Sequence, residues 1–251
     1  MAAPKVLIPF YSRTGTIERL ARAVAEGAEA EGAEVRLARA RELIGHDIMS
    51  SVPGWKESAE AINARYPAPT SDDALWADAV IFGTPTRFGI VSSELKAYID
   101  GLGGLWAQGK LNGKVGSVFA GSSQAHGGNE ATVLSLWAPL AHLGFIIVPT
   151  GYADAVMFAG AGSPYGASVI SGNPPSGPTE AELAVARFQG KRVTQVARKA
   201  LSACLVSSAA SVPTQMMLLQ NGANSPVRIG RSKPPREPMT TRSGRRNAAM
   251  A

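Results

Sequence analysis

The sequence predicts an α/β fold in which helices cover both faces of a five-stranded parallel sheet, forming a three-layer sandwich. Two observations support this prediction. Short apolar runs alternate with helical periodicities over the first 201 residues, which is typical of parallel strands joined by right-handed crossover helices. Hydrophobic residues make up 45% of the chain, which is enough to form a sizeable core.

The first predicted strand, Lys5–Tyr11, contains Pro9, which conflicts with the rule that proline is confined to edge strands and bulges. We keep the strand because a clear amphipathic helix follows it. Apolar residues from Ile17 to Ala28 recur at helical spacing along one face, and Gly32 is suited to end that helix.

Four further strands and three further helices are predicted. The strands are Glu34–Arg39, Ala79–Thr84, Val115–Ala120 and Phe145–Val148. The helices are Ser92–Leu102, Ala131–Leu143 and Thr179–Leu201, the last of which begins with the capping box Thr179-x-x-Glu182. The long connections Arg41–Ser71, with room for a short helix, and Tyr152–Pro178 interrupt the pattern, and loops of this length are usually functional or mobile.

The net charge of +6 lies entirely in the C-terminal tail, residues 202–251, which carries seven basic residues and one acidic residue. The predicted domain, residues 1–201, is therefore neutral. The tail has no sustained periodicity and is rich in Ser, Pro and Arg, so we expect it to be disordered. Arg-rich disordered segments bind nucleic acids non-specifically, but these charges are scattered and lack interleaved aromatic residues. We expect a solubilising extension rather than a nucleic-acid arm.

Other features of the composition indicate a cytoplasmic protein without a bound metal. Cys204 is the only cysteine and cannot form an internal disulfide, which favours a reducing compartment. Neither a secretory signal nor an apolar stretch long enough to span a bilayer is evident. His46, His126 and His142 do not have the spacing of zinc ligands, so we expect no metal site.

The turn between the first strand and the first helix carries hydroxyl residues around a glycine. Its residues are Ser12, Arg13, Thr14, Gly15, Thr16 and Ile17. Hydroxyl groups and the unpaired N–H groups of a helix N-terminus are suited to bind one phosphate monoester. An ordinary capped turn fits the same residues about as well, because Ser and Thr are preferred at helix starts in any case.

Two neighbouring strands end in polar loops at the same edge of the sheet, where α/β proteins bind ligands. The third strand continues into Pro85, Thr86, Arg87 and Phe88, and the fourth into Gly121, Ser122, Ser123, Gln124, Ala125, His126 and Gly127. Three polar loops at three adjacent strand ends are stronger evidence for a binding site than any one loop. They predict a site for a flat ligand that carries a phosphate group.

Six separated motifs resemble, in order and spacing, the WrbA family of flavodoxin-like NAD(P)H:quinone oxidoreductases. They are YSRTGTIE, FGTPTRFG, GGLWAQGKLNGK, AHGGNE, LAHLGFIIVPTGY and SPYGAS, and the match as a whole extends over roughly Lys5 to Leu201. The resemblance implies FMN binding, the sheet order 2-1-3-4-5, two-electron quinone reduction in a ping-pong cycle at one shared site, and a homotetramer.

The resemblance also implies roles for individual residues. Ser12 to Ile17 would hold the FMN phosphate, Pro85 to Phe88 would line the isoalloxazine ring, and the loop from Gly121 to Gly127 would bind its polar edge. His142 would approach the flavin across a subunit boundary and donate a proton to the quinone, and Trp106 would form a wall of the nicotinamide and quinone site. From the sequence alone, His142 fits a helix-terminal residue equally well, and Trp106 fits ordinary packing.

The chain departs from the family pattern at two places. Thr14 stands where the family often has an aromatic residue that helps to form the nicotinamide pocket, and Gly121-Ser122-Ser123-Gln124 replaces the usual Ser-Thr-Gly-Thr. Both changes bear on nicotinamide binding more than on FMN binding.

The alternative function is a flavodoxin-type electron carrier that binds FMN without turning over a substrate. Such carriers are typically strongly acidic, whereas this domain is neutral.

Overall fold

The first strand, β1 (Lys5–Phe10), lies in the middle of the sheet, and the computed structural model explains how it accommodates Pro9. Its pairing with β2 (Glu34–Arg39) is unbroken from Lys5 to Phe10. Its pairing with β3 (Ala79–Pro85) is interrupted at Ile8 and Pro9 and resumes where Phe10 lies opposite Gly83. The missing proline N–H therefore falls at a gap in the ladder, so the predicted strand is confirmed despite the proline.

The parallel sheet has the order β2-β1-β3-β4-β5, as predicted. Its fourth strand, β4 (Val115–Ser122), pairs near its start with the short β5 (Ile146–Ile147). Near its end, β4 pairs with β6 (Ser168–Ile170), which the sequence analysis placed in a loop. The edge position is thus shared by two short segments. The structure describes residues 3–159, 163–173 and 175–207.

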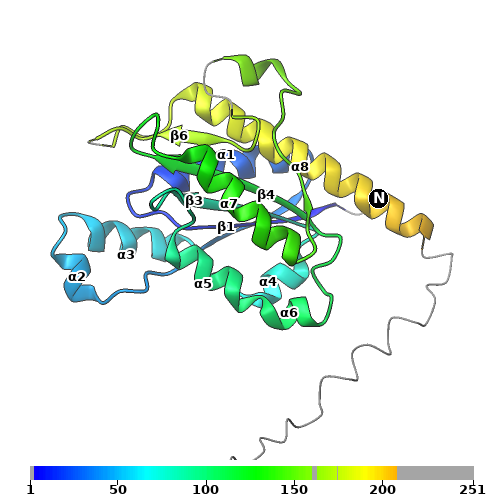
Figure 1. Cartoon of the computed structure of the whole chain (residues 1–251), viewed down its shortest axis with the longest axis horizontal. Coiled ribbons are helices and arrows are strands. Elements are labelled where there is room, and N and C mark those ends of the chain that lie inside the picture. Colours follow the sequence, from blue (N-terminus) through cyan, green and yellow to red (C-terminus); the bar gives the residue numbers. More distant parts are fainter. Residues whose placement is uncertain (1–2, 160–162, 174, 208–251) are drawn as a thin grey trace, which may run out of the picture. The chain divides into compact units, whose positions relative to one another are not determined.

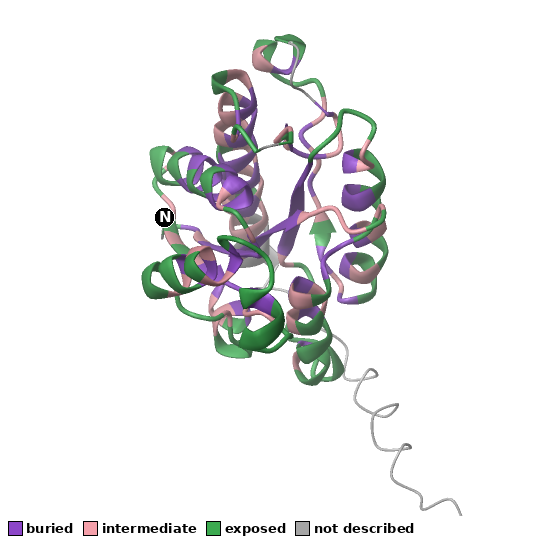
Figure 2. Cartoon of the chain, turned by 90° about the vertical axis from the view of Figure 1, so that its left-hand side faces the viewer, coloured by how far each residue is buried: buried purple, intermediate pink, exposed green. Residues whose placement is uncertain are grey.

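Helices cover both faces of the sheet (Figure 1). On one face, α1 (Thr16–Ala30) and α8 (Glu180–Ser207) pack over the β1 side chains of Val6, Ile8 and Phe10. The opposite face is covered by α4 (Ser71–Trp76), α5 (Ser93–Gly101) and α7 (Asn129–His142). Figure 2 shows buried residues along the strands and on the helix faces turned toward them. The described domain is therefore the predicted three-layer sandwich.

The two long connections contain more structure than the sequence indicated. The connection after β2 forms α2 (His46–Ser50) and α3 (Trp55–Arg65), and the one after β5 contains a 3-10 turn, Ala155–Phe158, before β6. A short helix, α6 (Gly103–Ala107), follows α5. The capping box of α8 is confirmed, because the Glu182 N–H donates to Thr179 Oγ1 and the Thr179 N–H donates to the Glu182 carboxylate.

The C-terminal helix continues beyond the predicted end of the domain. Helix α8 passes Leu201 and ends at Ser207. The rest of the predicted tail, residues 208–251, lies outside the described residues. The expectation that these residues are disordered therefore stays a prediction. No helix within the described ranges is both long and apolar enough to cross a membrane.

Helices α1 and α8 approach so closely that glycine is required at their crossing. A Cβ atom on Gly27 would lie 1.9 Å from the Arg187 carbonyl oxygen, and one on Gly190 would lie 1.9 Å from the Val24 carbonyl oxygen. Both positions meet backbone atoms, which cannot rotate away as a side chain could. A methyl group at either position must therefore push the helices apart.

We expect Gly190→Ala to lower the free energy of unfolding by about 1–3 kcal/mol, because overpacking forces the two backbones to separate. Gly101→Ala in α5 is the matched control, since no atom lies within 4 Å of its added Cβ. It should be neutral or stabilising by up to about 1 kcal/mol through helix propensity. Urea unfolding monitored by circular dichroism measures both changes. Equal effects of the two variants would contradict the close approach of α1 and α8 at Gly190.

Candidate functional site

The loop between β1 and α1 presents an open helix N-terminus. Gly15 occupies the N-cap position of α1 in the left-handed conformation, with φ of 88°, and no side chain caps the helix. Ser12 Oγ accepts a hydrogen bond from the Gly15 N–H at 3.1 Å, which closes the loop. The first N–H groups of α1 have no side-chain acceptor within the described part of the chain, so they are available to an anionic group.

The loop after β3 is held against the end of β4. The Thr86 N–H donates to the Gly121 carbonyl oxygen at 2.7 Å. Thr86 Oγ1 accepts from the Gly89 N–H at 3.2 Å and bonds Thr132 Oγ1 of α7 at 2.7 Å. Phe88 sits at the tip with a positive φ of 54° and a fully exposed side chain. The loop is therefore fixed at Thr86 and presents Phe88 to solvent.

The loop after β4 is closed by a local hydrogen bond and tied to β6. Ser122 Oγ donates to the Gln124 carbonyl oxygen at 2.6 Å, and Ser171 Oγ donates to the Ser122 carbonyl oxygen at 3.3 Å. Ser171 follows β6, a strand of only three residues, whose polar neighbours gave no periodic signal in the sequence. Its place in the site could not be anticipated for that reason.

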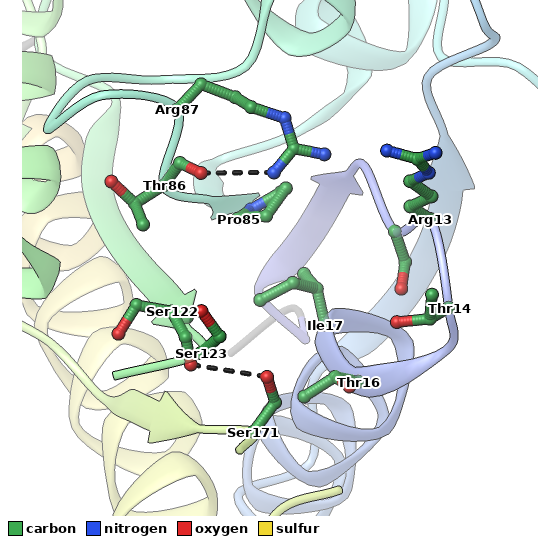
Figure 3. Close-up of a pocket in the computed structure, with 12 residues that line it drawn as sticks. Arg13, Thr14, Thr16, Ile17, Pro85, Thr86, Arg87, Ser122, Ser123 and Ser171 are labelled. Carbon is green, nitrogen blue, oxygen red and sulfur yellow. Dashed lines mark hydrogen bonds between the residues drawn. The ribbon is translucent and has the colours of Figure 1, made fainter. Parts of the chain in front are cut away.

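The three loops enclose one cavity of about 240 Å³ at the carboxyl edge of the sheet (Figure 3). It is lined by Ser12, Arg13, Thr14, Thr16, Ile17, Pro85, Thr86, Arg87, Gly121, Ser122, Ser123 and Ser171. Hydroxyl groups and two guanidinium groups dominate this lining, Ile17 and Pro85 are its apolar members, and no carboxylate belongs to it. The cavity is thus suited to an anionic ligand with an apolar part.

Most but not all of the predicted site residues meet here. Six residues of the predicted loops do not line the cavity, namely Gly15, Phe88, Gln124, Ala125, His126 and Gly127, and Ala125 lines a neighbouring hollow instead. The residues of the first loop that line the cavity include all three hydroxyl side chains. Within the described ranges, no group of three or more His, Cys, Asp or Glu residues could hold a metal ion.

Trp106 and His142 lie together, but away from this cavity. They line a second, largely apolar hollow of about 450 Å³ formed by α5, α6 and α7. Helix α7 begins beside the first cavity and ends at His142, and fourteen helical residues span about 20 Å. Within one chain, His142 and the first cavity are therefore at opposite ends of a helix.

A buried arginine behind the first loop holds it in place. Arg39, at the end of β2, is fully buried and donates to the Ser12 carbonyl oxygen at 2.9 Å. It also donates to the Glu42 carboxylate at 2.9 Å and to Asn63 Oδ1 of α3 at 2.6 Å. Burial alone would raise the pKa of Glu42, but the hydrogen bonds and charge of Arg39 outweigh burial and lower it. This ion pair is therefore maintained at neutral pH.

The fold and the cavity define a class of protein. A parallel sheet of order 2-1-3-4-5 whose ligand cavity lies at the switch between the first and third strands is a flavodoxin-like domain. The model of the family described as NADPH-dependent FMN reductase matches residues 11–159. The chain belongs to this family.

Individual relatives and structures agree with this assignment. The chain is 45% identical to the "NAD(P)H dehydrogenase (quinone)" of Geotalea daltonii, over 79% of this chain and 99% of the relative. It is 41% identical to the protein of the same name from Deinococcus radiodurans, over 80% and 100%. A WrbA-like flavodoxin of Agrobacterium tumefaciens matches with a TM-score of 0.55 and 26% identity, over 78% of this chain and 99% of the other.

The stability of the domain should depend on pH through Glu42. Because its pKa in the folded protein is below the ordinary 4.5, the unfolded chain takes up a proton first as the pH falls. The stabilisation by Glu42 is therefore complete above that ordinary value and is lost as the pH falls through the lowered pKa. We expect Glu42→Gln to be less stable at neutral pH but to lose less stability on acidification.

Urea unfolding of the wild type and the variant at several pH values between 7 and 3 measures this difference. Asp72→Asn is the control, because Asp72 is exposed and forms no ion pair with the described residues. Parallel acid profiles for the wild type and Glu42→Gln would contradict the role of the buried pair.

Proposed function

We propose that the protein is an FMN-dependent oxidoreductase that transfers two electrons from NAD(P)H to a quinone, so that NAD(P)H, a proton and the quinone yield NAD(P)⁺ and the quinol. The observation that carries the proposal is the cavity where the uncapped N-terminus of α1 meets the ends of β3 and β4. The names of the relatives, NAD(P)H dehydrogenase (quinone), support the choice of substrates.

The residues of the cavity fit FMN. The Ser12, Thr14 and Thr16 hydroxyls and the free N–H groups of α1 suit a phosphate monoester, and the absence of a carboxylate from the lining removes electrostatic repulsion. Bound FMN would supply the redox chemistry, accepting two electrons from NAD(P)H and passing them to the quinone. A ping-pong order, in which both substrates use one site in turn, completes the proposal.

The protein residues would bind and orient the cofactor. Residues 12–17 would hold the phosphate, while Pro85, Thr86 and Arg87 would line one side of the ring and Gly121, Ser122 and Ser123 its polar edge. Phe88, Gln124, Ala125, His126 and Gly127 would contribute from the outer parts of their loops. The bond from the Thr86 N–H to the Gly121 carbonyl oxygen would keep the two ring-binding loops in register.

A second copy of the chain would complete the substrate site. We assign proton donation to the quinone oxygen to His142 and a wall of the nicotinamide and quinone site to Trp106, both supplied by a neighbouring subunit of a homotetramer. The separation of the two hollows supports this assignment, because within one chain Trp106 and His142 line a hollow that shares no residue with the cavity. The single cysteine of the chain is consistent with a cytoplasmic location for the enzyme.

The proposal is tested by the spectrum of the protein with FMN. Under anaerobic conditions, NADH or NADPH should bleach the visible absorption of the bound flavin, and benzoquinone should restore it. Steady-state rates at several fixed quinone concentrations should give parallel double-reciprocal lines. Flavin that binds but is not reduced by either nicotinamide would instead support the electron carrier, and protein that binds no flavin would overturn both functions.

Complementation between variants tests the contribution of a second subunit. We expect His142→Ala to lower the rate of quinone reduction by about 10²-fold, since a proton donor is lost. Thr16→Glu should abolish FMN binding by placing a carboxylate at the N-terminus of α1. Alone, His142→Ala should keep only about 1% of the wild-type rate, and Thr16→Glu should be inactive. After unfolding and joint refolding, roughly a quarter of the sites would combine an intact cavity with an intact His142 if subunits mix at random.

Recovery of activity in the mixture, but not in either variant refolded by itself, is the expected result. Size-exclusion chromatography with light scattering checks that both variants assemble as the wild type does. A mixture that stays inactive although it assembles would contradict a site shared between subunits.

A further inference from the structure

Arg13, in the loop before α1, is stacked on a tryptophan from a distant part of the chain. Its guanidinium carbon lies 3.6 Å from the ring centroid of Trp55, the first residue of α3. Trp55 is only 9% exposed and packs with Met49 and Ala59 in a small apolar cluster. The two residues are separated by all of α1 and β2 in sequence, so this contact exists only in the folded protein.

The Trp55 platform is held by hydrogen bonds near the C-terminal end of α3. Asn63 accepts from the buried Arg39, and Arg65 forms an ion pair with Glu18 of α1 at 2.9 Å. The Tyr66 hydroxyl donates to the same carboxylate at 3.1 Å. These bonds fasten α3 to α1 and to the end of β2. The indole that carries Arg13 is therefore attached to the same elements that form the cavity.

The charge of Arg13 is not neutralised by the protein. Among the described residues it forms no hydrogen bond and no ion pair, and its stacking contact is with a neutral ring. The guanidinium of Arg87, the other arginine of the cavity, donates among the described residues only to the carbonyl oxygen of its neighbour Thr86, at 3.1 Å. Figure 3 shows the two guanidinium groups toward the same end of the cavity. This end is thus strongly cationic.

Stacking fixes the guanidinium without consuming its donors. The indole covers a face of the group, whereas the N–H bonds point outward in its plane. A planar set of free donors matches the oxygens of a phosphate dianion, and such charge-assisted bonds are stronger than neutral ones. Holding the side chain in advance also lowers the conformational entropy that ligand binding would cost.

We propose that Trp55 is a positioning residue that holds Arg13 as a preorganised receptor for a phosphate monoester. The inference rests on the proposed function, whose ligands include two such groups, the 5′-phosphate of FMN and the 2′-phosphate of NADPH. The pair makes the enzyme selective for FMN over riboflavin or for NADPH over NADH, according to which phosphate it meets.

The experiment compares ligands that differ only by the phosphate. Dissociation constants for FMN and riboflavin are measured with the apoprotein by flavin fluorescence, and KM values for NADPH and NADH with the FMN-loaded enzyme. The variants are Arg13→Met, Trp55→Leu and Trp55→Phe. Trp76→Leu is the matched control, because Trp76 carries a similar stack with Arg36 at 3.8 Å, and Arg36, unlike Arg13, does not line the cavity.

We expect Trp55→Leu and Arg13→Met to weaken binding of one phosphorylated ligand by about 3- to 30-fold, the range that corresponds to a cation–π contact. Its dephosphorylated counterpart should change by less than about twofold. Trp55→Phe should restore most of the selectivity, and Trp76→Leu should leave it unchanged. Arg13→Met leaves the packing of α3 intact, so it remains informative if Trp55→Leu fails to fold.

The outcomes separate the two phosphates and the two proposals. Loss of FMN affinity with riboflavin unchanged identifies the flavin phosphate, and a rise in the NADPH KM with NADH unchanged identifies the dinucleotide phosphate. Equal losses for both members of a pair, or no loss in either pair, would overturn the inference. Wild-type protein that binds neither flavin would overturn the proposed function itself.

Discussion

The buried guanidinium of Arg39 connects the parts of the molecule that form the site. A charge removed from water is costly unless it is paired, and the two terminal nitrogens of Arg39 donate to the Ser12 carbonyl oxygen, the Glu42 carboxylate and Asn63, while its Nε has no partner among the described residues. These partners come from the cavity loop, the segment after β2 and helix α3. Removing any one of them would leave part of a buried charge without a partner. The requirement to satisfy one buried group therefore fixes three segments that are distant in sequence.

The parallel sheet determines where the cavity forms. Because all strands run in one direction, β1, β3 and β4 deliver their polar loops to a single edge, and β6 adds Ser171 beside them. The close crossing of α1 and α8, with glycine at the contact, holds α1 against the sheet so that its N-terminus opens into this edge. The same topology carries the end of α7 away from the cavity, which is why one chain does not bring His142 to it.

The sequence predicted features that arise from local patterns. Strand β2 and the capping box of α8 follow from alternation and residue type alone, and the hydroxyl side chains from Ser12 to Thr16, which residue type made a candidate anion site, line the cavity. Strand β1 was predicted although proline is normally excluded from central strands. Its ladder with β3 is interrupted at Pro9, so the missing N–H of the proline leaves no gap in the pairing that is present. Patterns of this kind need no knowledge of distant contacts.

Features that depend on distant contacts were missed. Strand β6 is too short for a period to be visible, and the full burial of Arg39 could not be inferred from the alternating run Glu34–Arg39, where charged residues indicate a solvent-facing side. The stack of Arg13 on Trp55 joins two residues whose proximity is created by the fold. Individual loops could be assigned to the site, whereas the residues that hold those loops in position could not.

The distribution of charge shows how a neutral domain can select an anion. The net charge of +6 belongs to residues 202–251, so residues 1–201 carry no excess of basic side chains. Surface arginines such as Arg187 and Arg65 are paired with carboxylates, and their charges are largely cancelled. Arg13 is instead placed against an aromatic ring, which orients its charge without neutralising it. In the proposed receptor, the aromatic partner of Arg13 adds selectivity for a phosphate without any excess of basic residues in the domain.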